Sequence, residues 1–206
     1  MVDTEYPSLN NPNYDMVKWV SFGYSSQKKE SRLSEQRNIA AHYETLTTDE
    51  VESRDMRTCL SYRERLRGAR FAPAWHEFDW DQVPTHCISD FTVVDVVPPP
   101  LDFVYRFWGT HLAEGQKQEL TGQSAHNLRP TEEADIICRQ YREVVDSRQP
   151  VFFRSAVFGW SRLELAGIAL RMPFSNDGEQ VTNIVSLTDF NMAYKTLEDT
   201  VDLSRG

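Results

Sequence analysis

Short apolar runs in the second half of the chain have the pattern of β-strands. The run from Phe91 to Val97 reads F-T-V-V-D-V-V, and its β-branched and aromatic residues favour a strand over a helix. Between two later runs of this kind lies Asp177-Gly178, a dipeptide typical of hairpin turns. The pattern predicts five strands, at about residues 91–97, 101–108, 150–157, 161–172 and 180–188.

Elsewhere the apolar residues recur with the spacing of a helix. Residues 28–46 carry a rough apolar stripe among charged positions, which predicts a first helix. The capping-box pattern Thr47-x-x-Glu50 predicts the start of a second helix, and Gly68 is expected to end it. A third helix is predicted over residues 131–147, where acids fill the first turn and apolar residues share one side.

This order of elements predicts an α+β domain with a mostly antiparallel sheet and helices on one face. We expect a partly helical N-terminal extension at residues 1–50, the domain at 51–190 and a C-terminal tail at 191–206. The helices of the extension would either pack on the domain behind them or form a dimer contact.

Composition and charge narrow the class of protein. The 206-residue chain has no run of about 18 apolar residues and no signal-peptide pattern, so we expect a cytoplasmic protein without a membrane segment. Its net charge of -9 falls entirely within residues 71–206, which disfavours binding to nucleic acid. The three cysteines are widely separated, so buried thiols are expected rather than disulfides or zinc ligands.

Five short motifs together resemble those of the small bacterial single-domain PAS proteins. Their joint order and spacing carry the resemblance, which covers roughly residues 54–189. The motifs are Y-R-E-R-L-R-G (62–68), Y-R-F-W-G-T (105–110), L-T-G-Q-S (120–124), Y-R-E-V-V-D-S-R-Q-P (141–150) and R-M-P-F-S-N-D-G (171–178).

The resemblance implies a PAS fold, a five-stranded antiparallel sheet in the spatial order 2-1-5-4-3 with short helices and one long helix across one face. It also implies a sensory or interaction module in signal transduction, which binds a small ligand or a partner and signals through flanking helices. Such domains are rarely enzymes. We expect the output to pass through the N-terminal segment, either to a regulatory protein or to a second copy of the chain as a homodimer.

The sequence shows no motif for catalysis. It lacks a G-x-S-x-G elbow, a phosphate-binding glycine loop and an H-E-x-x-H pair. The adjacent carboxylates Glu132 and Glu133 point apart on a helix, so no catalytic residue is predicted. His76 and His86 lie among acidic residues, but their spacing matches no metal-binding motif, so no metal site is predicted either.

Two cofactors remain as alternatives to a small ligand. His111 and His126 flank a segment where PAS domains often contact ligands, so either is a candidate axial ligand for haem, unless both are surface histidines. The light-sensing PAS branch places a cysteine over its flavin, whereas this chain reads S-A-H-N-L-R-P at 124–130. Flavin adduct chemistry is therefore excluded, while a flavin held without an adduct stays open.

Alternation within the strands predicts a pocket lined by aromatic side chains. Tyr105 and Phe107 share one face of a regular strand and, with Met172, could line such a pocket, although core packing alone also accounts for them. Arg106 and Arg171 interrupt apolar strands: each either lies outward, paired with an acid, or points inward, where it can hold a carboxylate. The predicted ligand contacts are Tyr105, Phe107, Arg106, His111, His126, Met172 and Arg171.

Overall fold

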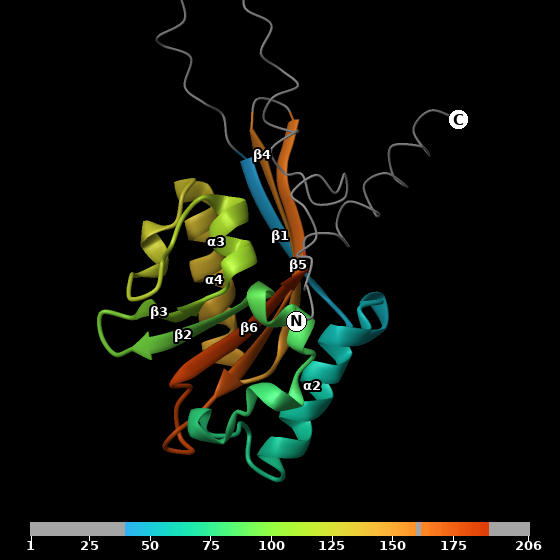
Figure 1. The fold of residues 1–206 in the computed structure, drawn as a ribbon. Helices are drawn as coiled ribbons and strands as arrows, with labels where there is room; N and C mark the ends of the chain where they lie inside the picture. The colour runs from blue at the N-terminus through green and yellow to red at the C-terminus, as the bar shows by residue number, and fades with distance from the viewer. Residues whose placement is uncertain (1–39, 160–161, 190–206) are drawn as a thin grey trace, which may run out of the picture. The chain divides into compact units, whose positions relative to one another are not determined.

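Six antiparallel strands form one sheet in the computed structural model, which describes residues 40–159 and 162–189 (Figure 1). In the sheet they lie in the order β1-β4-β5-β6-β2-β3. All of the described residues belong to one unit of the chain, residues 37–206. The strands are β1 (Ala40–Leu46), β2 (Phe91–Val97), β3 (Asp102–Trp108), β4 (Val151–Gly159), β5 (Arg162–Phe174) and β6 (Asn183–Asp189).

The five strands predicted from the apolar runs are all present, with ends that shift by a few residues. The turn between β5 and β6 also forms where Asp177-Gly178 predicts it. There the Asp177 Oδ1 atom accepts hydrogen bonds from the backbone N–H groups of Glu179 and Gln180, both at 2.8 Å. Gly178 has a φ of 75°, a conformation that glycine adopts without strain.

Among the described residues, three helices and five short 3₁₀ turns accompany the sheet. The helices are α2 (Arg54–Arg67), α3 (Thr110–Gln116) and α4 (Thr131–Ser147), so the helix predicted over 131–147 is confirmed. Gly68 follows α2 with a φ of 56°, as expected for the residue that ends a helix. The 3₁₀ turns are η1 (Thr48–Glu50), η2 (Trp75–Glu77), η3 (Trp80–Gln82), η4 (Thr85–Asp90) and η5 (Ala125–Asn127).

The helix predicted over residues 28–46 is wrong for its last seven residues, which form strand β1, and residues 28–39 lie outside the described part. Strand β1 pairs with β4 along its whole length, from Ala40 opposite Phe158 to Leu46 opposite Phe152. A weak helical stripe is overridden here because the edge of β4 offers a continuous ladder of backbone hydrogen bonds. Part of the predicted N-terminal extension is therefore a strand of the sheet.

The capping box forms, but it starts a shorter element than predicted. The Glu50 carboxylate accepts hydrogen bonds from both the backbone N–H and the hydroxyl of Thr47, each at 2.8 Å. These bonds close the single turn η1. Helix α2 begins several residues later, after Ser53, whose hydroxyl accepts a hydrogen bond from the Met56 backbone N–H at 3.3 Å.

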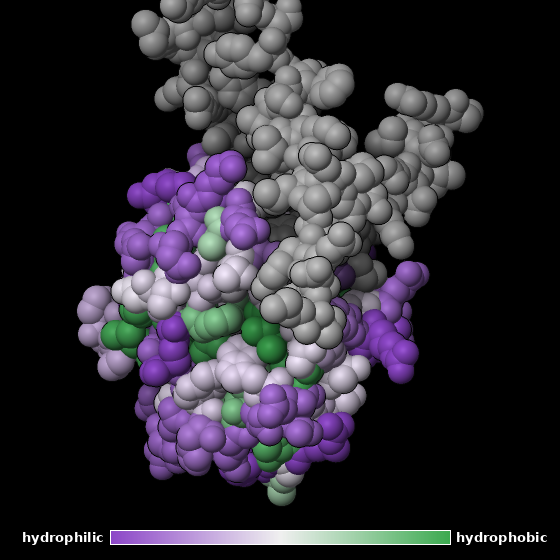
Figure 2. Space-filling model, viewed as in Figure 1, coloured by the Kyte–Doolittle hydropathy of each residue, from purple (hydrophilic) through white to green (hydrophobic). Residues whose placement is uncertain are grey.

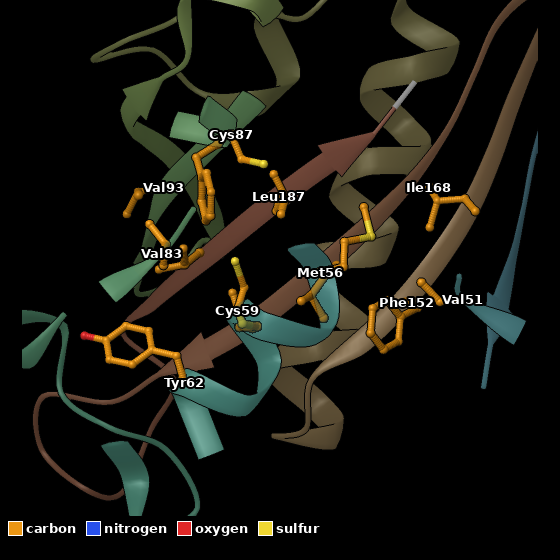
Figure 3. Close-up of a cluster of buried hydrophobic side chains, with 14 of the residues drawn as sticks. Val51, Met56, Cys59, Tyr62, Val83, Cys87, Val93, Phe152, Ile168 and Leu187 are labelled. Carbon is orange, nitrogen blue, oxygen red and sulfur yellow. The ribbon is translucent and has the colours of Figure 1, made fainter. Parts of the chain in front are cut away.

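Helices cover both faces of the sheet, so the prediction of helices on one face is wrong. On the first face, which we call the α2 face, Met56 and Cys59 of α2 point toward apolar side chains of the central strands (Figure 3), and Tyr62 is buried in the same core. The rings of Trp75 and Phe78, from the segment after α2, stack at 5.4 Å and pack against the same core. The strands contribute Phe91, Val93, Phe152, Ile168, Leu170, Met172, Phe174, Val185 and Leu187 to this face.

The opposite face, which we call the α4 face, is covered by α4 and α3 (Figure 1). Tyr141 and Val144 of α4 are buried there against Phe103, Phe153 and other side chains of the strands. Of the surface that Figure 2 colours by hydropathy, most is hydrophilic or intermediate, and hydrophobic residues show near the middle and in smaller spots at the left and lower edges. The fold is thus a sheet between two helical layers, with separate cores on its two faces.

Candidate ligand-binding site

A cavity lies on the α4 face, between the sheet and the two helices that cover it. Its floor is made by small side chains of adjacent strands, because Ser155 of β4 and Gly167 and Ala169 of β5 leave space that larger residues would fill. The cavity measures about 50 Å³, counted as the space that the centre of a water molecule can reach. The rest of its lining is Thr92, Tyr105, Trp108, Leu112, Gln116, Glu133, Ile136, Ile137, Tyr141, Arg171 and Thr188.

A β-bulge in β3 decides which aromatic residues reach this cavity. Val93 pairs with Phe107 and its neighbour Val94 pairs with Tyr105, so Arg106 is the extra residue of the bulge. The bulge reverses the alternation beyond it, and Tyr105 and Trp108 therefore lie on the same face, with their rings 4.6 Å apart. Trp108 thus lines the cavity.

Phe107 and Met172, two predicted contacts, lie on the α2 face instead. The Phe107 ring packs against Trp80, with their centroids 5.2 Å apart, because the bulge turns it away from Tyr105. Met172 is buried in the same core. It follows Arg171 directly on a regular strand, so these two side chains point to opposite faces.

Arg171 points inward and is 2% exposed. Its guanidinium donates hydrogen bonds from Nε and Nη2 to the Gln140 Oε1 atom, at 2.9 and 2.7 Å, and from Nη1 to the Ser186 hydroxyl at 3.1 Å. The guanidinium also lies 4.4 Å from the centroid of the Tyr141 ring. In the part of the chain that the structure describes, no ion pair involves Arg171, so the cation is held by neutral groups alone.

Arg106 takes the other of the two expected positions, with its side chain directed outward. It is half-exposed and donates two hydrogen bonds to the Asp95 carboxylate, at 2.8 and 2.9 Å. As the bulge residue of an edge strand, it reaches its acid across the surface of β2. The two strand arginines that the sequence could not separate therefore have opposite environments.

A group of polar atoms gathers where α3 and α4 meet over the cavity. The Gln116 Nε2 atom donates a hydrogen bond to the Glu133 Oε1 atom at 2.9 Å. Burial raises the pKa of Glu133 to about 8, against the lowering effects of the Gln116 hydrogen bond and of the Arg171 charge. Near neutral pH this carboxyl group is therefore mostly protonated, and it does not neutralise Arg171.

Two polar atoms on residues of the lining have no hydrogen-bond partner among the described residues. They are the indole Nε1 of Trp108, whose side chain is almost fully buried, and the amide Oε1 of Gln116. A buried donor or acceptor left without a partner costs about 1–3 kcal/mol, so such atoms are uncommon unless something else binds them.

The two histidines proposed as haem ligands lie outside the cavity lining. The Nδ1 atom of His111, in the first turn of α3, is 2.9 Å from the Ser89 hydroxyl and 3.1 Å from an Asp90 oxygen. His126 is exposed, and its Nδ1 atom lies 3.6 Å from the Cys138 sulfur. Both therefore bond to residues of neighbouring loops and helices, at the corner of the fold.

The corner after β3 depends on a glycine for a reason that the sequence does not reveal. Gly109 has an ordinary φ of -64°, so no unusual backbone angle requires it. A Cβ atom at this position would instead collide with the backbone carbonyl of Ser89. The next corner does use the conformational freedom of glycine, since Gly122 has a φ of 79°.

One cluster among the described residues has ligand types suited to a metal ion. Single ligand atoms of Asp55, His86 and Cys87 all lie within 4.8 Å of one another, on the far side of the sheet from the cavity. The Asp55 carboxylate already pairs with His86 at 2.9 Å. Burial, followed by the nearby Asp55, raises the pKa of the Cys87 thiol to about 12, which opposes the thiolate that a metal requires.

The cysteines are buried and unpaired, as predicted. Sequence reasoning missed seven residues of the lining that carry polar or aromatic groups: Trp108, Gln116, Glu133 and Tyr141, and the hydroxyl residues Thr92, Ser155 and Thr188. A signal was present for Glu133, because it shares a helix face with Ile137, Gln140 and Tyr141 and so places a carboxyl group in a buried stripe. For Trp108 there was none, since the bulge reverses its expected face.

Comparisons of the chain with models of protein families, with curated proteins and with solved structures found no match. The resemblance to PAS proteins therefore stays a prediction. Among the described residues, none of the helices has the length and apolar character needed to cross a membrane.

Proposed function

We propose that the chain is a PAS-type sensory and interaction module, which binds a small ligand in the cavity of the α4 face and acts without catalysis. The protein would have two signalling states, one with the cavity occupied and one with it empty. Either a regulatory protein or a second copy of the chain would recognise which state is present.

The order of the strands supports this proposal. When the edge strand β1 is set aside, the remaining five lie in the order β3-β2-β6-β5-β4. Numbered along the chain, this is the order 2-1-5-4-3 that the resemblance implies. Helix α4 also crosses one face of these strands, where a PAS domain has its long helix.

The observation that carries the ligand-binding proposal is the polar lining of a buried cavity. An apolar core on this face would be filled, as the α2 face is. The cavity instead has a buried cation and two buried polar atoms, for which the described part of the chain supplies neither an ion pair nor hydrogen-bond partners, respectively. Convergent polar groups in an otherwise apolar cavity are the usual feature of a small-molecule site.

A chain of hydrogen bonds leads from the cavity toward the N-terminal segment. Arg171 bonds to the Gln140 side-chain oxygen, and the Gln140 amide donates to the Ser155 hydroxyl on β4 at 2.7 Å. Ser155 lies opposite Tyr43 on the neighbouring strand β1, which is part of the predicted N-terminal extension. This sequence of contacts supports an output through residues 1–50, since a ligand that moves Arg171 would also disturb the pairing of β1 with β4.

Native mass spectrometry of the protein purified from its own host tests the proposal. We expect a mass increment of a small molecule on the unaltered chain. The variant Ala169→Leu fills the cavity floor and should lose the increment, while Ala169→Ser at the same position should keep it. A spectrum of the unaltered protein without any mass increment, or equal mass increments on both variants, would contradict binding in this cavity.

A further inference from the structure

The charge of Arg171 indicates what kind of molecule the cavity would bind. A guanidinium has N–H groups beyond the three that bond to Gln140 and Ser186, and its two terminal nitrogens can together hold a carboxylate. A buried cation without a counter-charge is costly, and no carboxylate of the described residues forms an ion pair with it. An anionic ligand would supply that charge.

The atoms without partners indicate a second group on the ligand. Trp108 presents an N–H donor and Gln116 an amide oxygen, and both residues line the cavity. A hydroxyl group is the smallest one that can accept from the indole and donate to the amide. It also suits the amide in its reversed orientation, because a hydroxyl oxygen can accept two hydrogen bonds.

The volume of the cavity limits the size of the whole ligand. One water molecule needs roughly 10–15 Å³ of such space, and the cavity measures about 50 Å³. It therefore suits a molecule of only a few heavy atoms, far smaller than a haem or a flavin. The remaining walls, among them Leu112, Ile136 and Ile137, are apolar and suit a short aliphatic part.

We propose that the cavity binds a short-chain hydroxycarboxylic acid, with its carboxylate on the Arg171 guanidinium and its hydroxyl between the Trp108 indole and the Gln116 amide. The inference rests on the proposed function, because it names the ligand class of the same cavity. It assigns charge recognition to one residue and hydroxyl recognition to two others, so the two parts can be tested separately.

The experiment compares three probes of nearly equal size by calorimetric titration of the full chain, together with its thermal midpoint. Lactate carries both groups, propionate lacks the hydroxyl and lactamide lacks the charge. We expect lactate to bind and to raise the midpoint, propionate to bind roughly tenfold more weakly and lactamide to bind at least about tenfold more weakly.

Substitutions then connect each group of the ligand to a residue. Trp108→Phe keeps an aromatic ring without the N–H, so it should remove most of the preference for lactate over propionate while propionate still binds. Arg171→Lys keeps the positive charge but loses the paired N–H groups of the guanidinium, so it should weaken the binding of both lactate and propionate. Arg106→Met is the matched control, because that strand arginine bonds to Asp95 on the surface, and it should leave all three affinities unchanged.

The outcomes separate this inference from the proposed function. Equal binding of lactate and lactamide, or a preference for lactate that survives Trp108→Phe, would overturn the ligand class while a small-molecule site remains. If no probe binds but the native mass spectrum shows another molecule, the ligand class fails and the proposed function stands. If no probe binds and the spectrum is bare, both fail. The ratio of two affinities within one folded variant is unaffected by a general loss of stability.

Discussion

The same strands present different side chains to the two faces of the sheet. On the α2 face, Leu170 and Met172 of β5 are buried against bulky apolar residues of α2 and of the neighbouring strands. On the α4 face, Ala169 and Arg171, which alternate with them along β5, lie beneath α4 and line a cavity. One face is filled by large apolar groups, and the other leaves space with polar atoms around it.

This difference indicates how the two faces divide their tasks. Close packing of large side chains gives the α2 face most of the dispersion and hydrophobic stabilisation that a core supplies. The α4 face forgoes part of that stabilisation, since small floor residues and buried polar groups both reduce it. Such a loss at a confined place is the usual sign of a site that binds something.

The largest expected effect comes from removing a ring of the α2 face. Phe174 is fully buried there, with its ring 5.7 Å from that of Phe78, so Phe174→Ala should lower the free energy of unfolding by about 3–5 kcal/mol. Thr188→Ala, at the edge of the cavity, should lower it by less than about 1 kcal/mol. Chemical denaturation measures both, and similar losses would show that the faces do not differ as described.

The next effect concerns the buried carboxyl group of the α4 face. The pKa of Glu133 is raised to about 8 in the folded protein, well above its unfolded value near 4.5. The folded state therefore holds more protons between these values, and the stability that this group contributes is lost as the pH rises toward 8, by at most about 1.4 kcal/mol per pH unit.

Glu133→Gln keeps the shape of the side chain and cannot ionise, so it should remove this pH dependence. The stability of the variant relative to the unaltered protein should therefore be greater at pH 8 than at pH 5. Urea denaturation at a series of pH values measures it. The neighbouring Glu132, which is less buried, gives the control variant Glu132→Gln. An unchanged pH profile for Glu133→Gln would mean that the carboxyl group is not held in its neutral form.

The smallest expected effect compares added volume on the two faces. Ala169→Val extends into the cavity and should change the free energy of unfolding by less than about 1 kcal/mol, whereas Val93→Leu must enlarge a filled core and should cost about 1–3 kcal/mol. Thermal and chemical unfolding of both variants measure the difference. A larger loss for Ala169→Val would show that the cavity does not accept the two added methyl groups.

Much of the fold could be predicted from local patterns. The strand at Phe91–Val97 and the helix at Thr131–Ser147 have the bounds that their apolar spacing indicates, and Gly68 and Asp177 act where local chemistry places them. Strand β1 could not be predicted, because its conformation depends on the free edge of β4, which lies more than a hundred residues further along the chain.

The candidate site was only partly predictable. Tyr105 and Arg171 were found because an aromatic and a charged residue stand out in apolar strands, but the sequence left open which way Arg171 points. Phe107 was placed on the wrong face, since a single extra residue in β3 reverses the alternation and no local signal marks it.

The sequence by itself determined where most strands and helices lie, since their periods and end signals act over a few residues. The tertiary structure alone decided that helices cover both faces, that Arg106 meets Asp95 while Arg171 stays buried, and that Trp108 and Glu133 lie at one cavity. These outcomes depend on contacts between residues far apart in the chain, where the register of one strand against another fixes which side chains meet.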